Sequence, residues 1–130
     1  MKKLIATAAL VLLAACGEKA PEAPAGGAGP PPMPEPLTMA LRPEATGGEA
    51  LYIEKCAMCH GPNGMGQGLL ARRLDQPDLE KRDDLTVDYV IQSARQGIGN
   101  MPMIARGEVS DEQMQQIAEY LAAGPHGAAK

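Results

Sequence analysis

Residues 56–60 read Cys-Ala-Met-Cys-His, which places two thiols and one imidazole within five consecutive positions. Two thiols three residues apart in a tight turn can each add to one vinyl group of the same porphyrin, and the next side chain can then bind the iron. The segment therefore predicts one covalently bound haem c, held by thioether bonds from Cys56 and Cys59. His60 is the predicted axial ligand on that side of the iron.

Three other chemistries use similar residues and are less well supported. A thioredoxin-like redox pair needs a βαβ setting, which the sequence around Cys56 lacks. A zinc site needs four ligands, and the only further cysteine and histidine are Cys16 and His126. A structural disulfide between Cys56 and Cys59 leaves His60 without a role. Haem is favoured, because the same chain also begins with a predicted export signal, which is described below.

Size and composition narrow the possible functions. The chain has 130 residues, a mass of 13.6 kDa and a formal charge of −4, which allows one small domain with tails. The acidic balance argues against a nucleic-acid partner, because such a protein needs a basic face. The chain has three tyrosines and no Phe or Trp, so side chains alone would fill a core poorly. A porphyrin would supply the missing aromatic bulk.

Residues 1–15 form a predicted signal peptide. Two lysines follow Met1, and residues 4–15 are apolar apart from one Thr, a run too short to span a membrane but suited to a signal-peptide core. The run ends Leu-Ala-Ala-Cys, which resembles the bacterial lipobox, in which the cysteine becomes the lipid-bearing first residue. This resemblance predicts lipidation of Cys16 and attachment to a membrane. Ordinary cleavage near Ala15, with a free Cys16, is the alternative.

Residues 16–43 are predicted to form the lipidated N-terminus and a disordered tether. Eight of the twelve prolines fall within residues 17–43, and this segment has neither a helical nor a strand period. Its 27 residues would reach roughly 30 Å as a flexible chain and about 80 Å in polyproline form. The tether would hold a folded domain away from the membrane.

Three principal helices are predicted after the tether. The first is expected over residues 49–56. Thr86 can cap a second, which carries apolar residues at helical spacing and ends at Gly97. A third follows the capping box Ser110-Asp-Glu-Gln113. No window alternates as a strand would, so residues 44–124 are predicted to be one all-α domain, followed by a tail at 125–130.

Three groups of positions carry a family resemblance: Gly48-x-x-x-Tyr52-x-x-x-Cys56-x-x-Cys59-His60-Gly61, Gly97-x-x-x-Met101-Pro102 and Ala118-x-Tyr120-Leu121. In this order, and over residues 46–123, they resemble class I cytochrome c. The resemblance implies a small fold of three principal helices around one haem, in which the first and last helices cross near Gly48. It implies Met101 as the second axial ligand. It also suggests haem packing by Leu69, Leu70, Leu74, Leu79, Tyr89 and Ile98.

Met103 is the runner-up to Met101 as the second ligand. Pro102 restricts Met101 to extended conformations, which favours a loop that presents its side chain in a fixed direction. A thioether opposite an imidazole would raise the reduction potential relative to two imidazoles.

Among the other polar residues, Arg72 and Arg73 are expected to be a solvated pair rather than partners of haem propionates.

Two further segments are expected to be exposed to solvent. His126 is predicted to lie in an exposed tail, and the charged run 78–84 is predicted to be a solvated surface.

Residues 56–71 and 96–105 contain no Asp, Glu, Lys or Arg. The face on which a partner docks is therefore expected to be uncharged, with candidate contacts at Ala57, Met58, Met65, Ile98, Met103 and Ile104.

The predicted function is electron transfer in the bacterial cell envelope by a membrane-tethered monohaem cytochrome c, which is not itself an enzyme. It would serve as a shuttle to an oxidase or as the electron-accepting partner of a periplasmic dehydrogenase. A haem enzyme or gas-binding protein with an open sixth coordination site is the alternative. By resemblance to other lipoproteins, Gly17 after the lipidated residue favours the periplasmic face of the outer membrane over the inner membrane.

Overall fold

The computed structural model describes residues 32–127 of the chain. The predicted signal peptide, Cys16, the tether up to residue 31 and the last three residues of the tail lie outside this range. The compact unit begins at Met33. None of the helices in the described range is long and apolar enough to cross a membrane.

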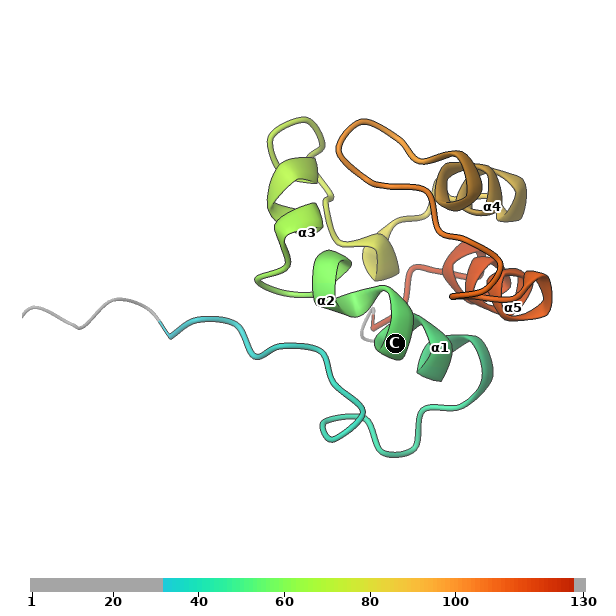
Figure 1. The fold of residues 1–130 in the computed structure, drawn as a ribbon. Helices are drawn as coiled ribbons and strands as arrows, with labels where there is room; N and C mark the ends of the chain where they lie inside the picture. The colour runs from blue at the N-terminus through green and yellow to red at the C-terminus, as the bar shows by residue number, and fades with distance from the viewer. Residues whose placement is uncertain (1–31, 128–130) are drawn as a thin grey trace, which may run out of the picture. The chain divides into compact units, whose positions relative to one another are not determined.

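All the regular secondary structure in the described part of the chain is helical. Its elements are α1 (Gly47–Lys55), α2 (Ala57–His60), α3 (Met65–Leu70), the 3-10 turn η1 (Leu79–Lys81), α4 (Val87–Gln96) and α5 (Asp111–Ala122) (Figure 1). Between residues 32 and 127 there is no strand, and one isolated bridge joins Ile98 to Met101. The all-α prediction is confirmed, and the three principal helices correspond to α1, α4 and α5.

The capping residues start α4 and α5 where the sequence predicts. The Thr86 hydroxyl oxygen accepts a hydrogen bond from the Tyr89 N–H at 3.2 Å, and α4 ends at Gly97. In front of α5, Ser110 and Gln113 each accept from the other's backbone N–H, which completes the capping box. These bonds satisfy N–H groups that the first helical turn would leave without partners.

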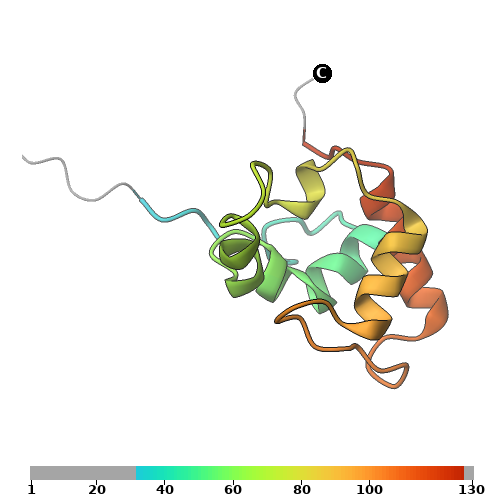
Figure 2. The ribbon, with the colours of Figure 1, turned by 90° about the horizontal axis from the view of Figure 1, so that it is seen from above.

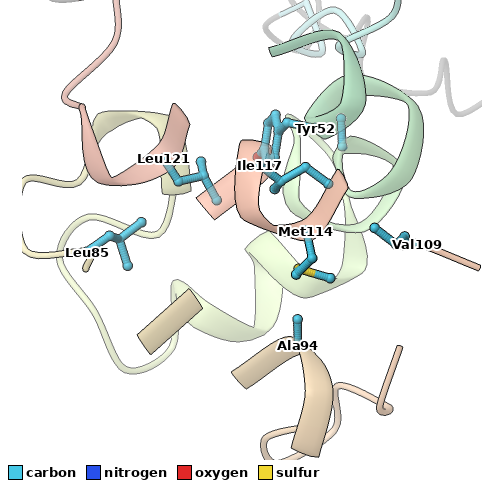
Figure 3. Packing of buried hydrophobic residues seen from close by; sticks show 8 residues of the cluster. Tyr52, Leu85, Ala94, Val109, Met114, Ile117 and Leu121 are labelled. Atoms are coloured by element: carbon cyan, nitrogen blue, oxygen red, sulfur yellow. The ribbon is translucent and has the colours of Figure 1, made fainter. Parts of the chain in front are cut away.

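The core is built around α5, which contacts both α1 and α4. Met114, Ile117 and Leu121 occupy its buried face (Figure 3). Tyr52 of α1 and Ala94 of α4 belong to the same cluster, and Ala94 lies below Met114 in Figure 3. The largest fully buried side chains are those of Tyr52, Met114 and Ile117, so the core contains one large ring from the chain itself.

Gly48 allows α1 and α5 to approach closely. A Cβ at Gly48 would lie 2.7 Å from the Cβ of Tyr120 and would overlap the backbone carbonyl of Gln116. Any larger side chain would force the two helices apart. The close approach that the family resemblance implies at this position is therefore present.

Residues 34–45, which we call the strap, pack on the domain. Leu37 packs against the core cluster, and its Cβ would lie 3.3 Å from a Cβ placed on Gly61. The Asn63 side-chain amide donates a hydrogen bond to the Pro34 carbonyl at 2.5 Å. The composition predicts a tether through residue 43, whereas the structure places its last ten or so residues on the domain. Two side chains of this segment, Leu37 and Arg42, find partners there.

Glu80 is buried and links the strap to the last helix. Its carboxylate accepts hydrogen bonds from the Arg42 guanidinium at 2.7 and 3.2 Å and from the Tyr120 hydroxyl at 2.6 Å. These partners offset the cost of burying a carboxylate. The prediction that residues 78–84 form a solvated surface is wrong at Asp78 and Glu80, which are both buried. It holds for the exposed residues Lys81, Asp83 and Asp84.

His126 is part of the fold. Its ring stacks on Tyr120, with 4.0 Å between the ring centroids and 13° between the planes. Its Nε2 lies 2.6 Å from the Tyr120 carbonyl oxygen, and its backbone N–H donates to the Glu80 carbonyl. The predicted exposed tail is therefore wrong at this residue, which the Tyr120 ring and two backbone carbonyls hold in place.

Candidate haem site

Backbone hydrogen bonds wind the attachment loop, residues 56–64, as a continuation of α1. The Cys56 N–H donates to the Tyr52 carbonyl at 2.8 Å, and the His60 N–H donates to the Cys56 carbonyl at 2.9 Å. Cys56 and His60 are therefore one helical turn apart and lie on the same side of the loop. This local winding brings the first thiol and the imidazole to one cavity.

The cavity lies between the attachment loop, α4, α5 and the methionine loop, residues 97–109. The methionine loop extends from α4 toward the side of the domain that carries α2 and α3 (Figure 1 and Figure 2). The empty space, counted to its open mouth and including the solvent there, is about 670 Å³. Its lining residues are Tyr52, Cys56, His60, Leu70, Leu79, Arg82, Leu85, Tyr89, Val90, Ser93, Ala94, Ile98, Met101, Ile104, Met114, Ile117 and Leu121.

His60 presents an imidazole without a protein partner. Its Nδ1 is buried and has no hydrogen-bond partner among the described residues, and a Cβ on Gly66 would lie 3.3 Å from that nitrogen. Burial lowers the pKa of His60, so the ring is neutral at neutral pH, the form that binds metal ions. A neutral, unpaired imidazole at the wall of an apolar cavity fits the chemistry of a haem ligand.

The two cysteines of the motif differ in exposure. Cys56 is half-buried and lines the cavity, whereas Cys59 is exposed; neither forms a disulfide. Burial raises the pKa of Cys56 to about 11, so its thiol is protonated at neutral pH and is not a reactive thiolate. In residues 32–127, no three His, Cys, Asp or Glu side chains are grouped to hold a metal ion. The disulfide and zinc alternatives gain no support.

The candidate methionines differ in how exposed they are and in whether they line the cavity. Met101 is half-buried and lines the cavity. Met103 is 66% exposed and does not line it. Met65 is also exposed. Met114 lines the cavity too, but it is buried in the core cluster on α5. Of the two candidates from the methionine loop, Met101 is the one that can reach a group in the cavity.

Arg82 is a cavity residue that the sequence did not reveal. Among the residues that the structure describes, it is the one charged side chain in the lining, and its Nε and Nη2 each donate to the Asp84 carboxylate at 2.7 Å. Arg72 and Arg73 are exposed and lie outside the lining. No periodicity or motif distinguishes Arg82 from its charged neighbours, so only the fold identifies it.

Most of the apolar residues suggested for haem packing lie at the cavity. Leu70, Leu79, Tyr89 and Ile98 line it, whereas the other two suggested residues do not; these are Leu69 and Leu74.

The expected docking residues are mostly exposed beside the cavity. Met58 is 89% exposed, and Met65, Ile98 and Met103 are also exposed. Ala57, however, is buried, so it is not a surface contact as predicted. Its methyl group faces the core cluster because α2 turns it inward.

Comparison with known proteins places the domain in a family. Residues 43–121 match the family described as cytochrome c oxidase, cbb3-type, subunit III. Over 84 residues, the chain is 33% identical to the cytochrome c subunit of 4-cresol dehydrogenase (hydroxylating) from Pseudomonas putida, which is 64% of this chain and 65% of that protein. It is 30% identical to cytochrome c6 of Rippkaea orientalis over 86 residues, 65% of this chain and 74% of that protein.

A third relative is much longer than this chain. The chain is 31% identical over 84 residues to thiosulfate dehydrogenase of Psychrobacter arcticus, which is 62% of this chain but only 26% of that protein. The chain thus spans about a quarter of that relative and just under two thirds of the cresol dehydrogenase subunit. No solved structure matches the chain significantly. On the family match and the cytochrome c6 relative, this chain belongs to the c-type cytochromes, which transfer electrons through haem c, in the family described as cytochrome c oxidase, cbb3-type, subunit III.

Proposed function

We propose that this protein carries single electrons through one haem c, held covalently by Cys56 and Cys59 and bound at its iron by His60 and Met101. The haem, when bound, supplies a reversible one-electron change at iron. The residues of the chain position it, exclude water from it and present it to partners.

One observation carries the proposal: His60 and Met101 line the same apolar cavity although they come from distant segments of the chain. An imidazole and a thioether are the ligand pair that raises the reduction potential of haem iron. The wall between them is almost entirely apolar, which keeps water away and further favours the less charged, reduced state. Arg82, the charged side chain that the described residues contribute to the lining, is our candidate partner for a carboxylate of the haem.

A second ligand from the chain favours an electron carrier over an enzyme. With both axial positions taken by side chains, the iron has no place for a substrate or gas. The alternative, a haem enzyme or gas-binding protein, requires Met101 to leave the cavity. Its half-buried position in the lining argues against that alternative.

We place the protein in the cell envelope, tethered by a lipid on Cys16 and facing the periplasm. The export signal and the lipobox-like run support this placement, and Gly17 favours the outer membrane. The partner is a redox protein. The likeness to a dehydrogenase cytochrome subunit supports a dehydrogenase as donor, and a shuttle to an oxidase is the second possibility.

Haem attachment and ligation are tested together on the purified protein. The haem should stay with the denatured polypeptide on a gel, and extraction of free haem by acidic acetone would refute covalent attachment. The ferric protein should have the weak red absorption band of an iron–thioether bond. Met101→Ala should abolish that band and Met103→Ala should keep it; the reverse result would assign the ligand to Met103.

Membrane attachment is tested by cell fractionation. Cys16→Ser should move the protein from the membrane fraction to the soluble periplasm without changing its absorption spectrum. Wild-type protein found only with inner-membrane markers would contradict the outer-membrane placement and leave the rest of the proposal intact.

A further inference from the structure

The methionine loop has few backbone hydrogen bonds to the rest of the domain. Ile98 and Met101 pair with each other at 3.0 and 3.1 Å, but these bonds lie within the loop. The Ile104 N–H donates to the Ala94 carbonyl at 2.8 Å and joins the loop to α4. The position of Met101 therefore depends on side chains that hold the outgoing part of the loop.

Arg95, near the end of α4, is the side chain that does this. Its Nη1 donates to the Ile104 carbonyl at 3.0 Å, and its Nη2 donates to the Val109 carbonyl at 2.9 Å. The same Nη2 lies 2.9 Å from the Asp111 carboxylate at the start of α5. The side chain is only 11% exposed. One guanidinium thus joins α4 to both ends of the segment that returns from Met101 to α5.

We propose that Arg95 is a positioning residue that keeps the methionine loop closed and so holds Met101 at the iron. The inference rests on the proposed ligation by Met101. A guanidinium suits this task because its planar fork can donate to two carbonyls at once in fixed directions. Hydrogen bonds from a charged donor are also stronger than those between neutral groups.

Arg106 provides a matched comparison within the same cluster. It binds the other oxygen of the Asp111 carboxylate at 2.8 Å, but it is 72% exposed and makes no described bond to a loop carbonyl. Its removal therefore takes away an ion pair with Asp111 and leaves both carbonyl contacts of Arg95 in place. Arg42, whose partners are Glu49 and Glu80, provides a second comparison, for a loss of stability that does not involve this loop.

The test measures how easily an added ligand displaces Met101. Ferric, haem-loaded, full-length protein is titrated with imidazole, which competes for the same position on the iron. The apparent affinity rises with the fraction of molecules whose loop is open. Arg95→Gln should raise the imidazole affinity at least about tenfold and weaken the red thioether band, because two carbonyl bonds are lost. Arg106→Gln should change the affinity less than about twofold.

Two further variants separate loop closure from general stability. Arg42→Gln should lower the unfolding temperature without changing the imidazole affinity, since it leaves the loop contacts intact. Arg95→Lys retains the charge but can reach one carbonyl at most, so it should raise the affinity by an intermediate factor of about three. If Arg95→Gln yields no haem-loaded protein, the lysine variant decides.

Wild-type imidazole affinity in both Arg95 variants would overturn the proposal. Met101→Ala serves as the reference. If it raises the affinity while the Arg95 variants do not, the role of Arg95 alone is refuted. If Met101→Ala itself leaves the affinity unchanged, the proposed ligation fails, and the role of Arg95 fails with it.

Discussion

Both the attachment loop and the methionine loop bring a candidate iron ligand to the cavity, but the bonds that hold them differ. The attachment loop is bound by successive local hydrogen bonds, including Cys59 to Cys56 at 3.1 Å and Gly64 to Gly61 at 2.9 Å. In the methionine loop, a side chain from α4 supplies the main contacts to the returning segment. The first arrangement is complete within a few residues, whereas the second depends on the fold being formed.

This difference suggests separate roles for the attachment loop and the methionine loop. A locally wound loop can present two thiols and an imidazole before the domain has packed, which suits the covalent addition of a cofactor during folding. A loop closed by tertiary contacts can form only around the finished core. Disruption of the attachment loop should therefore prevent haem attachment, whereas disruption of the methionine loop should remove only the second iron ligand.

The largest effect is expected when both thioether bonds are removed. The double variant Cys56→Ala with Cys59→Ala should hold no haem on a denaturing gel and should lose most of its helical circular dichroism. The reason is that the core has few large side chains and adjoins an apolar cavity. Met58→Ala, in the same loop but 89% exposed, should keep both properties. A well-folded, haem-free double variant would show that the side chains alone fill the core.

One glycine in each loop allows the effects of disturbing the two loops to be compared. A Cβ on Gly64 would overlap the Cys59 carbonyl, and a Cβ on Gly97, where φ is +75°, would lie 2.8 Å from the Met101 carbonyl oxygen. Either change to alanine should lower the free energy of unfolding by about 1–3 kcal/mol. Gly64→Ala should also reduce haem incorporation, whereas Gly97→Ala should keep the haem and weaken the red band.

The matched control for these glycines is Gly68 in α3, where a Cβ would meet nothing within 4 Å. Gly68→Ala should raise stability by about 0.5–1 kcal/mol, because it removes conformational freedom from the unfolded chain. Equal effects of Gly64→Ala and Gly97→Ala on haem content and on the red band would remove the distinction between the two sides.

The strap should affect stability without affecting the iron. Leu37→Ala should lower the free energy of unfolding by about 1 kcal/mol, as expected for a partly buried side chain. Its red band and reduction potential should stay unchanged, because the strap does not line the cavity. Leu41, in the same segment but 52% exposed, is the control, and its change to alanine should have almost no effect on chemical denaturation. A shift in potential with Leu37→Ala would mean that the strap also tunes the site.

The smallest effect is expected for ionic strength. Segments 56–71 and 96–105, which include the exposed residues Met58, Ile98 and Met103, carry no charged side chain. Electron transfer with the native partner, followed by stopped flow from low to moderate salt, should slow less than about tenfold. A steeper fall would contradict docking through apolar contacts and would point to charged groups outside residues 56–71 and 96–105.

Local signals in the sequence predicted the parts of the fold that local interactions build. The Thr86 cap and the capping box at Ser110 lie where expected, because each needs residues only three positions apart. The Cys-Ala-Met-Cys-His segment predicted the first side of the site for the same reason. The short helices α2 and α3 were not predicted, since 4 and 6 residues are too few to give a helical period.

The parts that were missed depend on contacts between distant residues. Arg82 and Arg95 lie in sequence surroundings that are also typical of solvated arginines. Asp84, the partner of Arg82, is only two residues away, but the fold alone places Arg82 at the cavity and gives Arg95 its two carbonyl partners. His126 follows a Gly-Pro pair that is typical of a tail, yet the Tyr120 ring holds it. The strap was missed because a proline-rich composition predicts disorder on average and does not reveal one well-placed Leu37 or Arg42.

The strap would also shorten the reach of the proposed membrane tether. If Cys16 carries the lipid as proposed, the part of the predicted tether that precedes the compact unit is residues 17–32, sixteen positions rather than the 27 of residues 17–43. The root-mean-square span of a flexible chain grows with the square root of its length, so the volume that the domain searches is roughly half that of the longer connection. A partner in the same membrane would then meet the proposed haem at roughly twice the effective concentration. A segment that never touches the cavity would in this way help to set the rate of encounter.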